Sequence, residues 1–315
     1  MSDLRKNSII KNRKNQTLLE VFPRFVASQT AKGVSDKTIQ TYYSHLQCIG
    51  KHIDLSLTFT ELQKEDIEDM IVSMRESGLA HNSISSYMRV FRTFFHWCQE
   101  EGLTELEIPR MKDVETVKPA YSDAELLLLL KKPDKKANFC EYRNWVIVNF
   151  FLNCGCRAGT VRQIRNEDVN LEMRQVIFRH TKTGKLQSIP LCERMVAILK
   201  EYMKVRRGED EDYLFCNEFG QELTEGALRS AIADYNLRRG VEKTSLHLFR
   251  HTFARKYLVD CGGDAFRLQK LLGHSTLAMT KHYCAIYDRD ISKNFDRFSP
   301  LAQMNTEREK IRKRA

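Results

Sequence analysis

Cationic, imidazole and phenol side chains follow one another through the second half of the sequence in an order that suits chemistry on a phosphate. They are Arg157, Lys182, His247, Arg250, His274 and Tyr283. His247 and Arg250 are three residues apart, so a helix places both on one face. Each residue alone has an ordinary structural explanation, such as a surface arginine, a solvated turn lysine or a core tyrosine. Only the whole set indicates a site.

Together these side chains favour a metal-free attack on a phosphodiester. Two guanidinium groups neutralise the charge that builds on the non-bridging oxygens, and histidines supply donors or move a proton. In such a cationic pocket a tyrosine hydroxyl, whose free pKa is about 10, becomes a nucleophile near neutral pH. A lysine then protonates the leaving 5′-oxygen. The phosphotyrosine ester stores the energy of the broken bond, so religation needs no ATP.

Other kinds of site are poorly supported by the sequence. It contains neither the G-x-x-x-x-G-K-S/T loop nor a strand-linked G-x-G-x-x-G motif of nucleotide-binding proteins. His247 and His251 are spaced like zinc ligands on a helix, but no glutamate lies between them and Arg250 would repel the metal. Cys154 and Cys156 have no second pair at zinc spacing, which favours two buried small residues. We expect no metal and no cofactor.

The composition indicates a soluble protein of about two domains with a polyanionic partner. The chain has 315 residues and a formal net charge of +10. No apolar run is long enough to cross a bilayer, and the polar, basic N-terminus is unlike a secretory signal. Nine scattered cysteines favour free thiols in a reducing compartment. We therefore expect a cytoplasmic protein with no membrane partner.

Helical periodicity dominates the first third of the chain. Apolar residues recur at spacings of three and four in four segments, at about 17–32, 35–49, 67–74 and 82–101. We predict an all-α domain over residues 17–103, after a basic tail over 1–16. Residues 104–119, which contain Pro109 and Pro119, are predicted to be the linker to a second domain.

The second domain, predicted over residues 120–300, mixes helices and strands. Ser122 and Glu125 fit a capping box that opens a helix. A buried helix is expected at about 143–152, and two short strands at 176–178 and 187–189 flank a hairpin turn. Further helices are expected at 193–205, 224–238, 246–261, 265–272 and 278–284, before a charged tail over 301–315. The fold class is mainly α with a small antiparallel β-sheet.

The motifs in this order resemble the tyrosine recombinases, also called the phage integrase family, which includes the Xer-type enzymes. The likeness rests on Gly155-Cys156-Arg157, Lys182-Thr183-Gly184-Lys185, His247 to Ala254, Leu272-Gly273-His274 and His282-Tyr283. The first domain is similar to the SAM-like core-binding domain of the family. The resemblance implies a compact two-domain, Xer-like or transposon-type member that forms a C-shaped clamp on DNA.

The resemblance also implies roles for the chemical residues. Tyr283 is the nucleophile that forms a 3′-phosphotyrosine. Arg157, Arg250 and His274 hold the scissile phosphate, and His247 assists proton transfer or contacts the phosphate.

The general acid for the 5′-hydroxyl is Lys182 by the family pattern, although spacing alone leaves Lys185 as an alternative. The sequence departs from the pattern at Thr160, where a carboxylate often follows the first arginine by three positions. Support for Arg157 is therefore expected to come from elsewhere or to be weaker.

The partners implied are a double-stranded DNA recombination site and further copies of the chain. The candidate DNA contacts are Lys37, Lys51, His81, Asn82, Arg89 and Lys185, each of which alone is an ordinary solvated polar residue. An apolar stripe follows Tyr283 and contains Ile291, Phe295, Phe298 and Leu301. It either packs on its own domain or docks on a neighbouring protomer of a synaptic tetramer.

The expected function is site-specific DNA recombination, as in the integration of mobile genetic elements. A type IB topoisomerase shares the chemistry but acts as a monomer, and the helical first domain and the C-terminal stripe favour the recombinase. A non-catalytic DNA-binding protein on the same fold is the other alternative. It is disfavoured because all six chemical positions hold usable residues.

Overall fold

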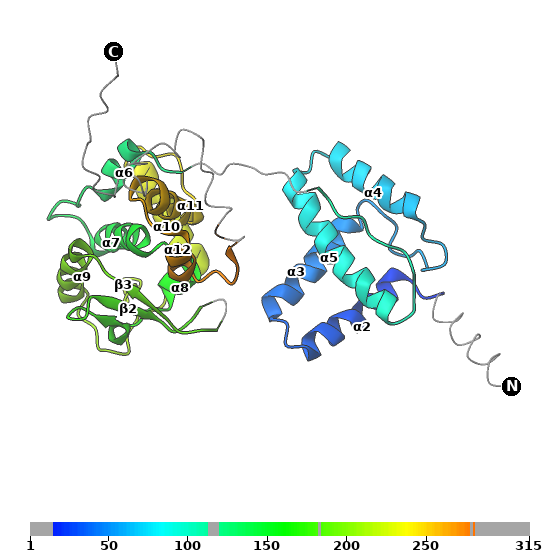
Figure 1. The fold of residues 1–315 in the computed structure, drawn as a ribbon, viewed down its shortest axis with the longest axis horizontal. Coiled ribbons are helices and arrows are strands. Elements are labelled where there is room, and N and C mark those ends of the chain that lie inside the picture. The colour runs from blue at the N-terminus through cyan, green and yellow to red at the C-terminus, as the bar shows by residue number, and fades with distance from the viewer. Residues whose placement is uncertain (1–14, 113–119, 182–183, 278–279, 281–315) are drawn as a thin grey trace, which may run out of the picture. The chain divides into compact units, whose positions relative to one another are not determined.

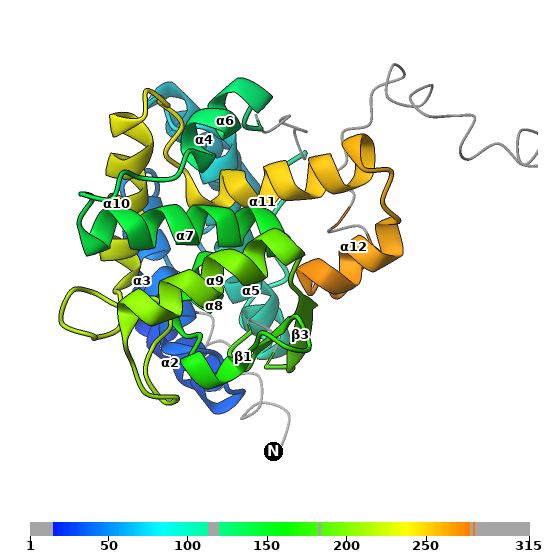
Figure 2. The ribbon, with the colours of Figure 1, turned by 90° about the vertical axis from the view of Figure 1, so that its left-hand side faces the viewer.

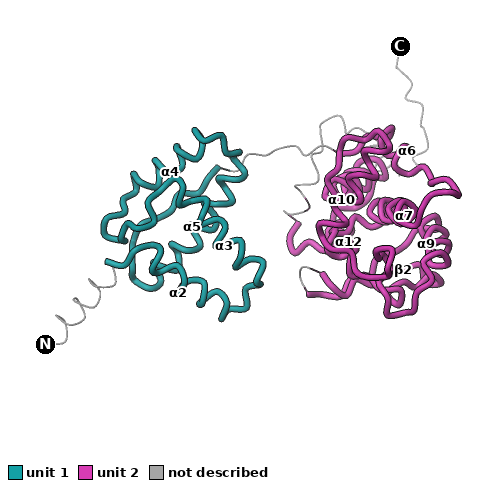
Figure 3. Tube along the Cα trace, turned by 180° about the vertical axis from the view of Figure 1, so that it is seen from behind, with its two compact units in different colours: residues 1–116 teal, residues 117–315 magenta. Residues whose placement is uncertain are grey.

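The computed structural model describes residues 15–112, 120–181, 184–277 and 280 (Figure 1). The chain divides into two compact units, residues 1–116 and 117–315 (Figure 3). Each unit has a hydrophobic core of its own. Among the described residues, none of the helices combines the length and the apolar character that crossing a membrane requires.

The described residues of the first unit, 15–112, form four helices, whose bounds follow the periodicity and the capping residues. They are α2 (Leu18–Ala31), α3 (Asp36–Ile49), α4 (Lys64–Glu76) and α5 (His81–Glu100). Thr17 and Glu20 form a capping box before α2, and the Ser35 side chain accepts from the Thr38 amide at the start of α3. Between them the helices bury a cluster of aromatic rings, among them those of Phe25 and Phe94.

The first part of the predicted linker packs on this helical unit. Ile108 is buried in its core. The Arg92 guanidinium of α5 donates to the carbonyls of Ile108 (3.3 Å) and Pro109 (2.6 Å). The Gln99 amide donates to the carbonyl of Leu106 (2.9 Å). Residues 104–112 therefore have fixed contacts with α5.

The second unit is organised around α7 (Phe139–Cys154), which is buried on most of its circumference. Four helices pack against it: α6 (Asp123–Leu130), α9 (Glu193–Arg206), α10 (Glu225–Arg238) and α11 (Leu246–Arg255). Figure 2 shows α7 and α11 as neighbours, with α12 (Ala265–Leu272) near the end of α11. A π-helical turn, Lys256–Asp260, follows α11, and the five-residue α8 (Ala158–Arg162) follows α7.

A small antiparallel sheet completes the second unit. Its strands are β1 (Val169–Asn170), β2 (Gln175–Phe178) and β3 (Gln187–Pro190), in the order β1-β2-β3. Val176 pairs with Ile189 and Phe178 pairs with Gln187. Val176, Phe178 and Ile189 are buried, which matches the alternation expected of a strand with one face on the core. The predicted fold class, mainly α with a small antiparallel sheet, is confirmed.

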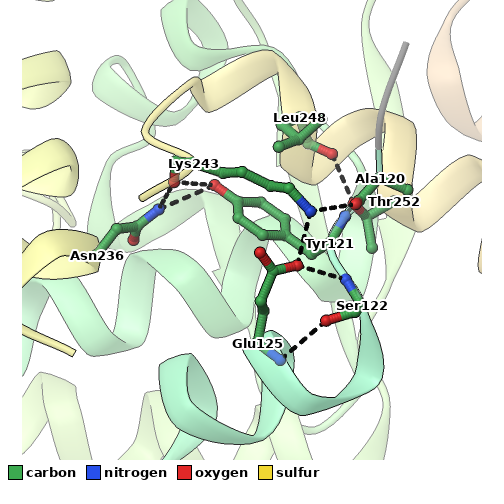
Figure 4. Close-up of polar contacts among 8 residues, drawn as sticks. All are labelled: Ala120, Tyr121, Ser122, Glu125, Asn236, Lys243, Leu248 and Thr252. Atoms are coloured by element: carbon green, nitrogen blue, oxygen red, sulfur yellow. Dashed lines mark hydrogen bonds and ion pairs between the residues drawn. The ribbon is translucent and has the colours of Figure 1, made fainter. Parts of the chain in front are cut away.

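The chain enters the second unit through a partly buried polar cluster (Figure 4). The Tyr121 amide donates to the Thr252 hydroxyl on α11 (2.9 Å), and the Tyr121 hydroxyl donates to the Lys243 carbonyl (3.0 Å). Asn236 donates to the Tyr121 hydroxyl (2.9 Å), and the Lys243 ammonium pairs with Glu125 (2.8 Å). Tyr121, Asn236 and Thr252 are buried, and their hydrogen bonds attach the chain before α6 to α11 and to the segment after α10. We call these five residues the entry cluster.

Candidate active site

The turn between α7 and α8 places Arg157. Helix α7 ends at Gly155, which adopts a left-handed conformation with φ 58°. A Cβ atom at this position would lie 2.3 Å from the Phe253 ring, so both the backbone and the space require glycine. Arg157 follows as the N-cap of α8 and is half-buried. The motif Gly155-Cys156-Arg157 is therefore a tight turn against α11.

Arg250, which lies on helix α11, is buried beside the Gly155 turn. Only 2% of Arg250 is exposed. One terminal nitrogen donates to the Gly155 carbonyl (2.9 Å), and the other donates to the Leu272 carbonyl (2.8 Å). The second nitrogen also lies 2.7 Å from Nε2 of His274. The guanidinium therefore joins the ends of α7 and α12.

His274 lies one residue beyond the left-handed Gly273 that ends α12. Its side chain is buried, and Nδ1 lies 2.8 Å from the Thr280 hydroxyl. Since Nε2 faces a guanidinium N–H, we assign the ring hydrogen to Nδ1, which then donates to Thr280. Burial, and then the charges of Arg250 and Arg157, lower the pKa of His274 to about 4. The imidazole is therefore neutral at pH 7.

Arg250 and His274 thus meet directly, and Arg157 lies near them, although the three residues come from distant parts of the chain. We call these three side chains the candidate phosphate pocket. The influence of Arg157 on the pKa of His274 places its guanidinium within electrostatic range of the imidazole. A pocket with two guanidinium groups and a neutral imidazole suits an anion with several acceptor oxygens, such as a phosphodiester. Within the described ranges, no group of three or more His, Cys, Asp or Glu side chains could hold a metal ion.

The β2–β3 hairpin lies beside this pocket and is held at both ends. On the β2 side, the buried Thr160 hydroxyl donates to the His180 carbonyl (3.4 Å). On the β3 side, Gln187 donates to two carbonyls of α12. Thr160 stands where the family often has a carboxylate, and here it links α8 to the hairpin. This contact was not predicted, because sequence spacing shows nothing of a bond to a carbonyl 20 residues away.

The two predicted groups that would carry the covalent step and the leaving-group proton, Tyr283 and Lys182, lie outside the described residues. His247 is exposed on α11, one turn before Arg250. Lys185 is exposed in the hairpin, and its carbonyl accepts from the Thr181 hydroxyl (2.8 Å). The apolar stripe at residues 291–301 and most of the predicted helix at 278–284 also lie outside the described part of the chain.

Two cysteines beside the pocket are buried, as their interpretation as small core residues requires. Cys154 is inaccessible and Cys156 is 5% exposed. Burial raises the pKa of the Cys156 thiol well above its usual range, so it stays protonated and unreactive. The eight cysteines in the described ranges are all free thiols.

The candidate DNA contacts of the first unit lie at helix ends and on exposed faces. Lys37, Lys51, Asn82 and Arg89 are exposed. His81 is half-buried, and its imidazole is hydrogen-bonded to the Lys112 carbonyl (2.8 Å).

Arg89 also lines a hollow of about 340 Å³ between α2 and α5, together with Lys32 and Arg92. Burial, followed by the charges of Arg110 and Arg89, lowers the pKa of Arg92. Like charges are therefore gathered at this hollow. Arg92 was not among the predicted contacts. Its position three residues after Arg89 on a helix does indicate that the two arginines share a face.

Two family models match the sequence. The model described as the phage integrase family matches residues 122–289, and the model described as the phage integrase N-terminal SAM-like domain matches residues 24–102. The chain belongs to the phage integrase family. As a member of this family of tyrosine recombinases, it is a site-specific recombinase that breaks and rejoins DNA strands.

Similar proteins span nearly the whole recombinase. The tyrosine recombinase XerD of Listeria innocua is 27% identical over 300 residues, which cover 90% of this chain and 99% of that protein. XerD of Staphylococcus haemolyticus is 28% identical over 316 residues, covering 91% and 100%.

Among solved structures, the Tn1549 transposon integrase in complex with transposon right-end DNA has a TM-score of 0.74 at 18% identity, covering 90% of this chain and 99% of that one. A lambda integrase dimer bound to a core site has a TM-score of 0.71 at 16% identity, covering 89% and 80%. A lambda integrase tetramer bound to a Holliday junction has a TM-score of 0.69 at 17% identity, covering 85% and 77%. These likenesses confirm the fold.

Proposed function

We propose that this recombinase cleaves double-stranded DNA through a covalent 3′-phosphotyrosine at Tyr283, with Arg157, Arg250 and His274 holding the scissile phosphate. The observation that carries the proposal is the buried Arg250 guanidinium, fixed 2.7 Å from His274 in a pocket that Arg157 shares. A pocket fixed before DNA arrives needs no reorganisation when charge develops on the phosphate.

In the cleavage step, the Tyr283 phenol oxygen bonds to phosphorus and the bond from phosphorus to the 5′-oxygen breaks. The phenol proton passes to a base, for which His247 is the candidate because it is exposed one helical turn before Arg250. The departing 5′-oxygen takes a proton from Lys182, with Lys185 as the alternative acid. Religation reverses these transfers, so the reaction needs neither a metal nor ATP.

His274 acts as a neutral partner of the phosphate-binding arginine in this scheme. Its pKa of about 4 keeps Nε2 available as an acceptor at neutral pH. An imidazolium at this position would repel Arg250 and would lose the acceptor that orients it. The contacts of Arg250 with Gly155, Leu272 and His274 thus limit the rotation of its guanidinium toward a bound phosphate.

The DNA partner is proposed to be a recombination site bound by the helical domain over residues 17–103 and the catalytic domain over 120–300 in a C-shaped clamp. The solved lambda integrases assemble on DNA as a dimer and as a tetramer. We extend that behaviour to this chain, with a synaptic tetramer joined through the C-terminal segment. The cytoplasm is the proposed compartment.

Trapping of the covalent adduct tests the proposal. The binding site is first located by footprinting, and a nicked version of it is incubated with the protein and analysed on a denaturing gel. We expect a protein–DNA adduct with the wild type and none with Tyr283→Phe. Tyr213→Phe is the matched control, because Tyr213 packs under Arg165 (5.1 Å) rather than in the pocket. An adduct that persists in Tyr283→Phe would refute the proposal, and relaxation of plasmids without the site would favour a topoisomerase.

A further inference from the structure

The end of α12 is held by two side chains from other elements. A helix leaves its last carbonyls without partners inside the helix. Here Nε2 of Gln187 donates to the carbonyls of Lys270 (2.6 Å) and Leu271 (2.8 Å). Arg250 donates to the next carbonyl, that of Leu272 (2.8 Å). The sheet and α11 therefore meet at three successive carbonyls.

This shared end of α12 leads directly into the pocket. Gly273 follows with φ 62°, and a Cβ atom on it would lie 3.0 Å from Oε1 of Gln187. His274 comes next, and its amide donates to the Gln269 carbonyl (3.0 Å). Only two residues separate the last carbonyl that Gln187 holds from the imidazole that contacts Arg250.

The backbone of Gln187 is fixed by strand pairing within the sheet. It begins β3 and pairs with Phe178 of β2, whose ring is buried in the core of the second unit. Its side chain is half-buried, so the two hydrogen bonds are partly shielded from water.

We propose that Gln187 is a positioning residue of the recombination reaction, which holds the end of α12 so that His274 and the Leu272 carbonyl meet the Arg250 guanidinium. The inference rests on the proposed function, in which Arg250 and His274 hold the scissile phosphate. Gln187 itself touches no reacting atom in this scheme. A small displacement of an anchored catalytic group is enough to slow an enzyme by about a hundredfold.

Gln187→Met tests the idea, since methionine keeps the length of the side chain and removes both N–H donors. We expect cleavage of the nicked site at saturating protein to slow by about tenfold to a hundredfold, with DNA affinity unchanged. Gln187→Arg supplies donors again and should recover most of the rate. The matched control is Gln175→Met on β2, because the Gln175 side chain accepts from Ser188 (3.0 Å) and should leave the rate unchanged.

A double-mutant cycle separates positioning from a general loss of stability. In a His274→Ala background, Gln187→Met should lower the cleavage rate much less than it does in the wild type, because the imidazole it positions is already gone and only the Leu272 carbonyl contact remains to be disturbed. If the fold-decreases in cleavage rate of the two single variants multiply in the double variant, or if Gln187→Met cleaves like the wild type, the inference is wrong. A DNA substrate with sulfur in place of the leaving 5′-oxygen gives a further check, because a thiolate leaves without being protonated. If this substrate restored the cleavage rate of Gln187→Met, the inference would also be wrong, since the substitution would then act on the acid that protonates the leaving group.

The two proposals fail in different ways. If the wild type forms no Tyr283 adduct, the proposed function fails. If it does form the adduct and the cycle is additive, only the role of Gln187 fails. The melting temperature of each variant shows whether it has kept its fold. If Gln187→Met has lost its fold, Gln187→Glu takes its place, because it replaces the N–H donor by an oxygen that faces two carbonyls. Its cleavage rate is then compared with that of Gln187→Arg.

Discussion

The two units of the chain differ in what they bury. Among the described residues, Thr104 is the one buried polar side chain of the first unit, whereas eleven lie in the second unit. Burying a polar group is unfavourable unless it is hydrogen-bonded. In the second unit, networks such as the entry cluster and the Arg250 contacts supply hydrogen bonds to buried polar side chains and join several elements at once. The first unit has exposed cations such as Lys37, Lys51 and Arg89 over a core of aromatic rings such as Phe25 and Phe94.

The two units therefore differ in the kind of substitution to which they are sensitive. In the second unit, one side chain can carry both a structural contact and a chemical group, so a change affects the rate of cleavage directly. In the first unit, an exposed cation can be removed without disturbing the packing. Three substitutions test this difference, beginning with the largest expected effect.

Arg250→Lys should nearly abolish cleavage. Lysine keeps the charge but cannot reach the Gly155 carbonyl, the Leu272 carbonyl and His274 with one planar group. We expect the single-turnover cleavage rate to fall by about a hundredfold to a thousandfold. Arg174→Lys is the matched control, since Arg174 pairs with Glu193 on the surface. Cleavage within a few-fold of the wild type would contradict the assigned site.

Gly155→Ala should destabilise the second unit. The methyl group would meet the Phe253 ring, and the backbone would be held at a positive φ. Together, overpacking and backbone strain predict a loss of about 2–5 kcal/mol, measured as a lower melting temperature of the full chain. Gly159→Ala, in α8, is the control because the added methyl group would meet open space and φ is not positive. Equal melting temperatures for the two variants would refute this account of the turn.

Arg89→Ala should have the smallest effect. It removes an exposed charge at the hollow between α2 and α5 and leaves the core intact. If Arg89 contacts a DNA phosphate, affinity falls modestly, and the slope of log affinity against log salt decreases by about one. Arg75→Ala removes the same charge from the exposed surface of α4. Identical salt slopes for both variants would mean that net charge, not a contact at the hollow, governs binding.

The sequence predicted the periodic, capped elements well. Helix α12 has the predicted bounds, and α2 (Leu18–Ala31) lies within the predicted segment at about 17–32. Helix α7 begins at residue 139 rather than about 143, because a helix buried on most sides shows no polar face to mark its length. The five-residue α8 and the two-residue β1 were missed, since so few residues show no period.

The site was predictable in its residue types and only partly in its contacts. Arg157, Arg250 and His274 stand out in the sequence because cations and imidazoles at these places suit a phosphate. Gln187 and Thr280 do not stand out, because their importance lies in contacts with α12 and His274 that only the folded chain creates. The two hydrogen bonds of Gln187 span 83 and 84 residues. A spacing rule within one helix or hairpin cannot find such a bond.

The Gly155 turn has a consequence for the two arginines. The Arg250 guanidinium donates to the Gly155 carbonyl, and Arg157 lies two residues after Gly155 in the same turn. A shift of this short piece of backbone therefore affects both arginines at once, because it moves the start of α8, which carries Arg157, and disturbs one of the contacts that hold Arg250. A single substitution in this loop thus reaches two positive charges that lie 93 positions apart in the sequence.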